Sequence, residues 1–167
     1  MELLRPGLWT WTGRHPAWTD SDEWDPDVRS YAVDLEGGLV LIDPVTPPAE
    51  LLRRDPAIVL TAPWHRRSSE DIGEPLAEPP RGIEARPAYF PEDRMLWIAR
   101  HNALVLGDSL MNAEPIPDEW LERASREDYN AALRPLLDLP IELLLPTHGA
   151  PIVHGAHEHL ARALGAR

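Results

Sequence analysis

Three apolar runs in the sequence each end close to a side chain that could bind a metal ion, and these side chains are His65, Asp108 and His148. The runs are rich in Leu, Ile and Val and are bounded by polar residues, which is typical of buried β-strands. Strands that end at one edge of a sheet could bring the three side chains into one pocket. Two imidazoles and one carboxylate suit a catalytic zinc ion that keeps a position for water, and they also suit iron or manganese.

The chemistry expected of one such divalent metal is hydrolysis. A metal ion lowers the pKa of its bound water and polarises a carbonyl or phosphoryl oxygen, so the substrate would be an ester, lactone, thioester or phosphoester. Arg66 and Arg67 follow His65 directly. Either guanidinium could hold an anionic substrate or stabilise an oxyanion. Either could instead fill a vacant metal position and pair with Asp108, which predicts a protein without metal.

Each candidate ligand also has a structural interpretation. His65 could be a hydrogen-bonded turn residue, and Asp108 could cap a helix or pair with an arginine. His148 stands in a Thr-His-Gly segment directly after an apolar run, which favours a ligand role. Asp43, which ends another apolar run, is expected to be structural and to accept hydrogen bonds near the site.

Two further groups of residues are weaker candidates. His154, His157 and His159 fall in segment 154–166, which is predicted to be a closing surface helix, and only the first two share a helical face. Ser109 follows Asp108, but no Gly-x-Ser-x-Gly elbow is present, so a serine mechanism is disfavoured.

The composition excludes several classes of partner and of chemistry. The formal net charge is −12, which argues against nucleic acid and anionic membranes as partners. The chain has no cysteine and no lysine, so disulfides, thiolate zinc sites and Schiff-base catalysis are excluded. No apolar run is long enough to span a bilayer, and the N-terminus does not resemble a secretory signal, so a cytoplasmic protein is expected.

The predicted elements come as hairpins first and helices late. The pattern repeats weakly in the two halves, as a hairpin, then a strand, then a histidine at the end of that strand, which suggests two sheets with helices outside. The predicted strands are 8–12, 30–35, 39–43, 58–61, 82–89, 95–98, 103–106 and 141–145, and the main predicted helices are 46–54, 118–122, one from 125 onwards and 154–166.

Four segments resemble, in the right order, the landmarks of the metallo-β-lactamase superfamily, and in particular its small single-domain hydrolase-like members. They are Leu39–Pro44, with its aspartate; Leu60–His65, in place of the histidine-rich metal motif; Ala103–Asp108, with the aspartate that can bridge metals; and Leu144–Gly149, with the final metal histidine. The resemblance covers nearly the whole chain. It implies an αββα sandwich, a single domain over residues 1–167, and a metal site formed by His65, Asp108 and His148.

The sequence departs from the family at the metal motif. The family's His-x-His-x-Asp-His pattern keeps one histidine here, His65, with Arg66 and Arg67 near the other ligand positions. A middle histidine is also missing, and only Glu92 or Asp93 could substitute for it. The resemblance therefore implies either a hydrolase-like protein with at most one metal, or a catalytically inactive binding or interaction module of the same fold.

The identity of the small-molecule substrate or ligand is not encoded in any recognisable motif. Trp18, Trp24 and Trp120 could form an apolar rim around a pocket, although covering the core is the simpler interpretation for the first two. If segment 95–98 lies at a sheet edge, it could pair with a second chain, which allows for a homodimer.

Overall fold

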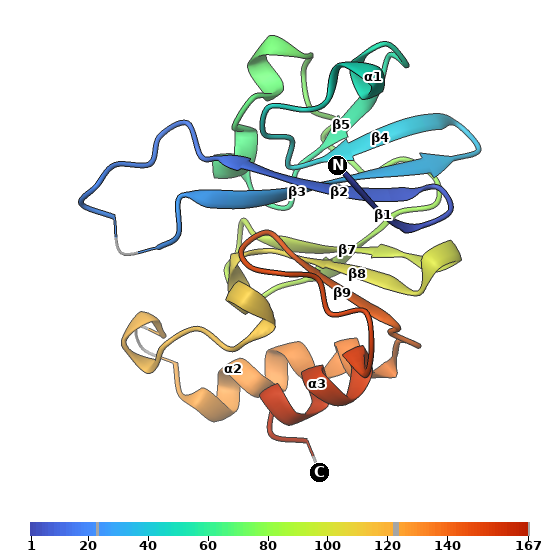
Figure 1. The fold of residues 1–167 in the computed structure, drawn as a ribbon. Coiled ribbons are helices and arrows are strands. Elements are labelled where there is room, and N and C mark those ends of the chain that lie inside the picture. Colours follow the sequence, from blue (N-terminus) through green and yellow to red (C-terminus); the bar gives the residue numbers. More distant parts are fainter. Residues whose placement is uncertain (23, 122–123, 167) are drawn as a thin grey trace. The chain divides into compact units, whose positions relative to one another are not determined.

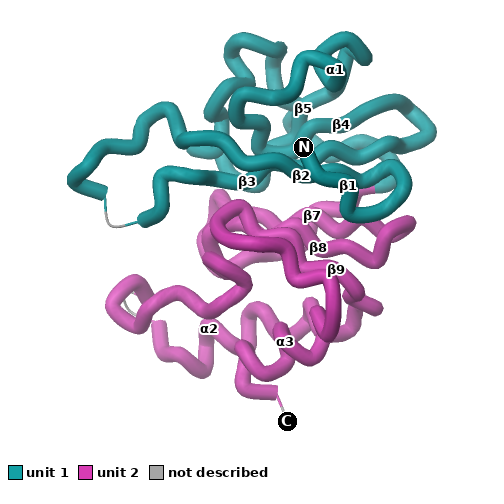
Figure 2. Tube along the Cα trace, viewed as in Figure 1, with its two compact units in different colours: residues 1–82 teal, residues 83–167 magenta. Residues whose placement is uncertain are grey.

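The computed structural model describes residues 1–22, 24–121 and 124–166. The chain forms two compact units, residues 1–82 and residues 83–167 (Figure 2). Each unit is built round one mixed β-sheet (Figure 1), in which the last two strands of the unit run parallel and the other neighbours run antiparallel.

The first unit contains a five-stranded sheet whose strands lie side by side in chain order. The strands are β1 (Glu2–Arg5), β2 (Leu8–Arg14), β3 (Asp27–Leu35), β4 (Gly38–Ile42) and β5 (Ala57–Val59). A short helix, α1 (Ala49–Leu52), follows β4, and two 3₁₀ turns, η1 (Pro63–Arg66) and η2 (Ser69–Asp71), follow β5. The predicted hairpin is confirmed as β3–β4, whose second strand begins at Gly38 with φ 122°.

Strands β3 and β4 are buried on both faces at their centre. One face places Trp11, Ala32 and Leu41 against Leu51 of α1. Alternate residues such as Tyr31 and Val33 point to the opposite face and are also buried. Strands buried on both faces appear in a sequence as nearly continuous apolar runs, which explains why β3 and β4 were predictable.

The second unit contains a four-stranded sheet, again in chain order. Its strands are β6 (Glu84–Pro87), β7 (Arg94–Ile98), β8 (Ala103–Leu106) and β9 (Leu143–Pro146). Its helices are α2 (Arg126–Leu133) and α3 (Ala156–Ala163), and its 3₁₀ turns are η3 (Ala99–His101), η4 (Asp108–Ala113), η5 (Asp118–Trp120) and η6 (Arg134–Asp138).

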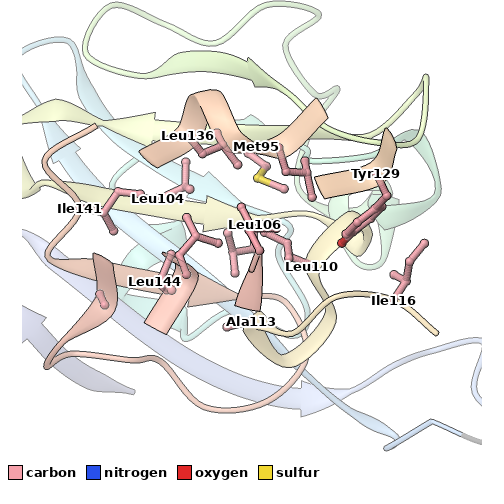
Figure 3. Close-up of a cluster of buried hydrophobic side chains, with 14 of the residues drawn as sticks. Met95, Leu104, Leu106, Leu110, Ala113, Ile116, Tyr129, Leu136, Ile141 and Leu144 are labelled. Carbon is pink, nitrogen blue, oxygen red and sulfur yellow. The ribbon is translucent and has the colours of Figure 1, made fainter. Parts of the chain in front are cut away.

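The core of the second unit lies between its sheet and its helices (Figure 3). Leu104, Leu106 and Leu144 come from the sheet, and Tyr129 of α2 and Leu160 of α3 pack in the same cluster. Burying an aliphatic side chain contributes about 1.5–3 kcal/mol, so this cluster is a main source of stability for the region that carries Asp108 and His148.

Several predicted elements are present with different bounds. Helix α3 begins at Ala156 rather than at residue 154, because Gly155 at φ 61° precedes it. The segment 46–54 contains only the four residues of α1, and segment 82–89 only the four of β6. The capping box of Ser125 and Asp128 is present at the start of α2, and Pro135 falls in the 3₁₀ turn η6 that ends the helix.

Two features differ from expectation. Strand β1 was not predicted, because its four residues are half-buried or exposed and show no apolar alternation. Segment 95–98 lies in β7, which pairs with β6 on one side and β8 on the other, so it is not at a sheet edge and cannot pair with a second chain.

Two mixed sheets with flanking helices confirm the predicted fold class. Among the described residues, no helix is long and apolar enough to cross a membrane.

Candidate metal centre

The first unit holds His65 in a fixed orientation. Strands β4 and β5 run parallel, with Ile42 opposite Val59, so the residues that follow them emerge at the same edge of the sheet. Asp43 follows β4, and Thr61 and the turn η1 follow β5. The side chain of His65 is 3% exposed, and its Nδ1 lies 2.7 Å from Thr61 Oγ1 and 3.2 Å from Asp43 Oδ2.

The carboxylate of Asp43 organises these contacts. It is fully buried, and the backbone N–H and the hydroxyl of Thr61 donate to its two oxygens at 2.9 and 2.6 Å. Because the Thr61 hydroxyl donates to Asp43, the Nδ1 of His65 is the donor toward both residues, which assigns its hydrogen to Nδ1. The sequence-based expectation that Asp43 accepts hydrogen bonds is confirmed, whereas no role was predicted for Thr61.

Burial alone would raise the pKa of the Asp43 carboxyl. The electrostatic attraction and hydrogen bond of His65, the charge of Arg67 and the hydroxyl of Thr61 outweigh burial and hold that pKa below its usual value. Asp43 is therefore an anion at neutral pH. A carboxylate that accepts the Nδ1 hydrogen is a common way in which proteins orient a metal-binding histidine, with Nε2 as the coordinating atom.

The two arginines after His65 make different contacts. Arg66 is exposed and pairs with Glu74 at 2.9 Å, and this hydrogen bond and charge raise the pKa of Arg66. Arg67 has a positive φ of 45°, and its Nη1 donates to the carbonyl oxygens of Arg29 and Asp43 at 2.9 and 3.0 Å. Arg67 therefore connects η1 to β3 and to the end of β4. The catalytic roles suggested for both arginines stay predictions.

The second unit brings Asp108 and His148 together. Strands β8 and β9 run parallel with Leu106 opposite Pro146, and the two candidate ligands follow these strands. The Nε2 of His148 lies 3.8 Å from Asp108 Oδ1, and the two side chains are 12% and 23% exposed. Ligand atoms about 2.0–2.2 Å from one tetrahedral zinc ion lie roughly 3.4 Å apart, so this separation fits two ligands of one metal.

The position of Asp93 was not predicted. Glu92 is exposed, as expected of a turn residue, but Asp93 is 5% exposed and its Oδ2 accepts the backbone N–H of Ser109 at 2.8 Å. The N-cap position of η4 is taken by Gly107, so the interpretation of Asp108 as a helix cap is wrong.

Two of the three C-terminal histidines, His157 and His159, have structural partners. The Nε2 of His157 lies 2.8 Å from the carbonyl oxygen of Leu137, and the Nε2 of His159 lies 3.1 Å from that of Ala113. Within the described part of the chain, these histidines form no cluster of metal-ligating atoms. They connect α3 to η6 and η4.

The comparisons with known proteins give one consistent result. No protein-family model and no curated protein matches the sequence. Many solved structures match, and three of them do so at 10–14% identity over 98–99% of this chain. They are a metallo-β-lactamase family protein, TTHA1429, from Thermus thermophilus (14% identity, 80% of its length, TM-score 0.60), the DIM-1 metallo-β-lactamase (10%, 95%, 0.63) and TMB-1 (12%, 95%, 0.59). The likeness confirms the predicted resemblance at the level of the fold.

Proposed function

Given that this chain has the metallo-β-lactamase fold, we propose that it is a hydrolase-like protein with a single metal site formed by His65, Asp108 and His148. Histidine and aspartate are both metal-ligating residues. The side chain of His65 is buried, and those of Asp108 and His148 are partly exposed. Two imidazoles and a carboxylate leave room for water at a zinc, iron or manganese ion.

The observation that carries the proposal is the way in which His65 is held. Its Nδ1 faces the buried, anionic Asp43, and the hydroxyl of Thr61 completes the contact. A histidine needed only to fill the turn could point its ring at water. Here a buried carboxylate, whose desolvation opposes folding, fixes one tautomer and one ring orientation.

The chemistry divides between the metal and the chain. When bound, a divalent metal supplies Lewis acidity for hydrolysis of an ester, lactone, thioester or phosphoester. Asp43 and Thr61 keep His65 in its coordinating tautomer. The carboxylate of Asp108 is partly exposed and can also accept a hydrogen bond from an attacking water. Arg66 is exposed and can attract an anionic substrate.

A second function, a binding module without catalysis, is favoured by one specific observation. The guanidinium of Arg67 donates to the carbonyl of Asp43 and so places a permanent positive charge at the residue whose side chain contacts His65. A cation there disfavours a second positive ion nearby. On this alternative, the fold is kept for binding a small molecule or another protein, and no metal is required.

Metal content decides between the two functions. We would express the protein in media supplemented with zinc, iron or manganese and measure bound metal by mass spectrometry, for the wild type, His65→Ala and His148→Ala. His154→Ala is the matched control, because His154 is exposed. About one metal per chain in the wild type and control, lost in both ligand variants, supports the site. A wild type without metal, whose melting temperature zinc does not change, contradicts it.

Activity is then tested with esters, lactones, thioesters and phosphodiesters. Turnover that requires metal and is lost in His148→Ala, while His154→Ala keeps it, supports hydrolysis. A protein that binds metal but turns over none of these classes would favour the binding module.

A further inference from the structure

Ser109, the residue after Asp108, makes hydrogen bonds through its side chain, its backbone N–H and its backbone carbonyl. It is fully buried. Its Oγ accepts the backbone N–H groups of Tyr89 and Phe90 at 2.9 and 3.2 Å, and its carbonyl oxygen accepts the hydroxyl of Tyr129. These donors come from the loop after β6 and from α2, so the start of η4 is fixed to two other segments of its unit.

The remaining polar group of Ser109, its backbone N–H, donates to Asp93 Oδ2 at 2.8 Å. The same carboxylate lies against Gly107. A Cβ atom added to Gly107 would meet Asp93 Oδ1 at 1.7 Å and its carboxyl carbon at 2.5 Å. Only glycine fits there, because the carboxylate occupies the space of a side chain. Asp93 therefore contacts the residues on both sides of Asp108.

We propose that Asp93 is a positioning residue for Asp108. By holding residues 107 and 109 at once, its buried carboxylate fixes the backbone of Asp108 and keeps Oδ1 beside the Nε2 of His148. A ligand fixed before the metal arrives binds with less loss of conformational freedom. The consequence for metal affinity rests on the proposed function, whereas the effect on the Asp108–His148 pair does not.

The charge of Asp93 is part of this role. A hydrogen bond to a carboxylate is roughly twice as strong as one to a neutral acceptor. The side-chain oxygen of an asparagine could still accept the N–H of Ser109, but more weakly. The NH₂ group of the asparagine would then take the place of the carboxylate oxygen that lies against Gly107. We therefore expect Asp93→Ala to release Asp108 most and Asp93→Asn to release it in part.

The first test needs no metal. The ring resonances of His148 are recorded by NMR in the wild type, Asp93→Ala, Asp93→Asn and Glu92→Gln, the last being the control from the same turn with an exposed side chain. Asp108→Asn shows how far these resonances move when the neighbouring charge is lost. We expect Asp93→Ala to move them in the same direction, Asp93→Asn to move them less, and Glu92→Gln to leave them in place.

Resonances of His148 that stay at their wild-type positions in Asp93→Ala, while Asp108→Asn moves them, would overturn the proposal. Should Asp93→Ala not fold, the nearly isosteric Asp93→Asn decides by the same criterion. A lower melting temperature with unchanged resonances would mean that Asp93 stabilises the fold and does not position Asp108.

The second test measures the zinc dissociation constant of the same variants well below their melting temperatures. We expect affinity to fall about 10–100-fold in Asp93→Ala, as is typical when a residue that supports a ligand is removed, and to stay unchanged in Glu92→Gln. Unchanged affinity in Asp93→Ala would overturn the consequence for metal binding. A wild type that binds no zinc would contradict the proposed function alone, because the NMR result still decides the role of Asp93.

Discussion

The last three strands of the two units have the same topology, but the units use their carboxylates differently. In each unit, a hairpin is followed by a strand that runs parallel to the hairpin's second strand. An aspartate follows the second strand of the hairpin, and a threonine and a histidine follow the parallel strand. In the first unit, Asp43 is buried and bonded to Thr61 and His65. In the second, Asp108 is partly exposed and 3.8 Å from His148.

Small differences in spacing explain this contrast. Asp43 comes directly after β4, whereas Gly107 separates Asp108 from β8. His65 comes four residues after Thr61, so the turn η1 brings its ring back to the threonine, whereas His148 directly follows Thr147. The carboxylate that is buried and bonded to its neighbours in the second unit is Asp93. One aspartate thus contacts a histidine, and the other contacts the residues on both sides of Asp108.

The largest expected effect comes from removing the buried carboxylate of the first unit. Asp43→Ala leaves the His65 Nδ1–H and the Thr61 N–H without their acceptor, so we expect the free energy of unfolding to fall by about 3–5 kcal/mol. Asp108→Ala, at a partly exposed position, should change it by less than about 1 kcal/mol. Urea denaturation of both variants measures the difference, and equal losses would contradict the contrast between the units.

A methyl group at Gly107 should lower the stability of the second unit. Gly107→Ala forces the Asp93 carboxylate to move, and overpacking of this kind costs about 1–3 kcal/mol. Gly37, in the β3–β4 turn, has open space around its Cα, so Gly37→Ala is the matched control with an expected change within about 0.5 kcal/mol. Thermal unfolding compares them, and a Gly107→Ala protein as stable as the control would show that the contact with Asp93 is unimportant.

The two threonines sharpen the comparison at a smaller scale. Thr61→Val removes the hydroxyl that donates to Asp43 and contacts His65, and we expect it to cost about 1–3 kcal/mol because buried partners lose a hydrogen bond. Thr147→Val, at the corresponding position of the second unit, is expected to cost less. Chemical denaturation of the pair checks this order, and the reverse order would refute it.

The smallest effect concerns stability at high pH. Burial raises the pKa of Tyr129 in the second unit to about 12, from its ordinary value of 10. Since the unfolded tyrosine loses its proton first, the stability that this group contributes is complete below pH 10 and is lost as the pH rises toward 12. Tyr129→Phe should lose less stability over this interval than the wild type, as measured by denaturation at pH 9, 10 and 11. Parallel curves for the two proteins would contradict the shift.

Much of the fold could be predicted because its signals are local. The β3–β4 and β7–β8 hairpins follow from apolar runs around short turns, and the capping box of α2 from Ser125 and Asp128. The resemblance that rests on residues 39–44, 60–65, 103–108 and 144–149 is matched by the fold of known metallo-β-lactamases. Strand β1 escaped prediction because an exposed edge strand leaves no apolar pattern.

The sequence by itself determined which chemically capable side chains stand at strand ends, because apolar runs and the polar residues that follow them are properties of neighbouring residues. Asp43, Asp108 and His148 were placed in this way. Only the tertiary structure decided which carboxylates are buried and what each one holds. Asp93 meets Ser109 across sixteen residues of chain, and Asp43 meets His65 across twenty-two. Such bonds form only after separate strands have paired, so no local pattern in the sequence could reveal them.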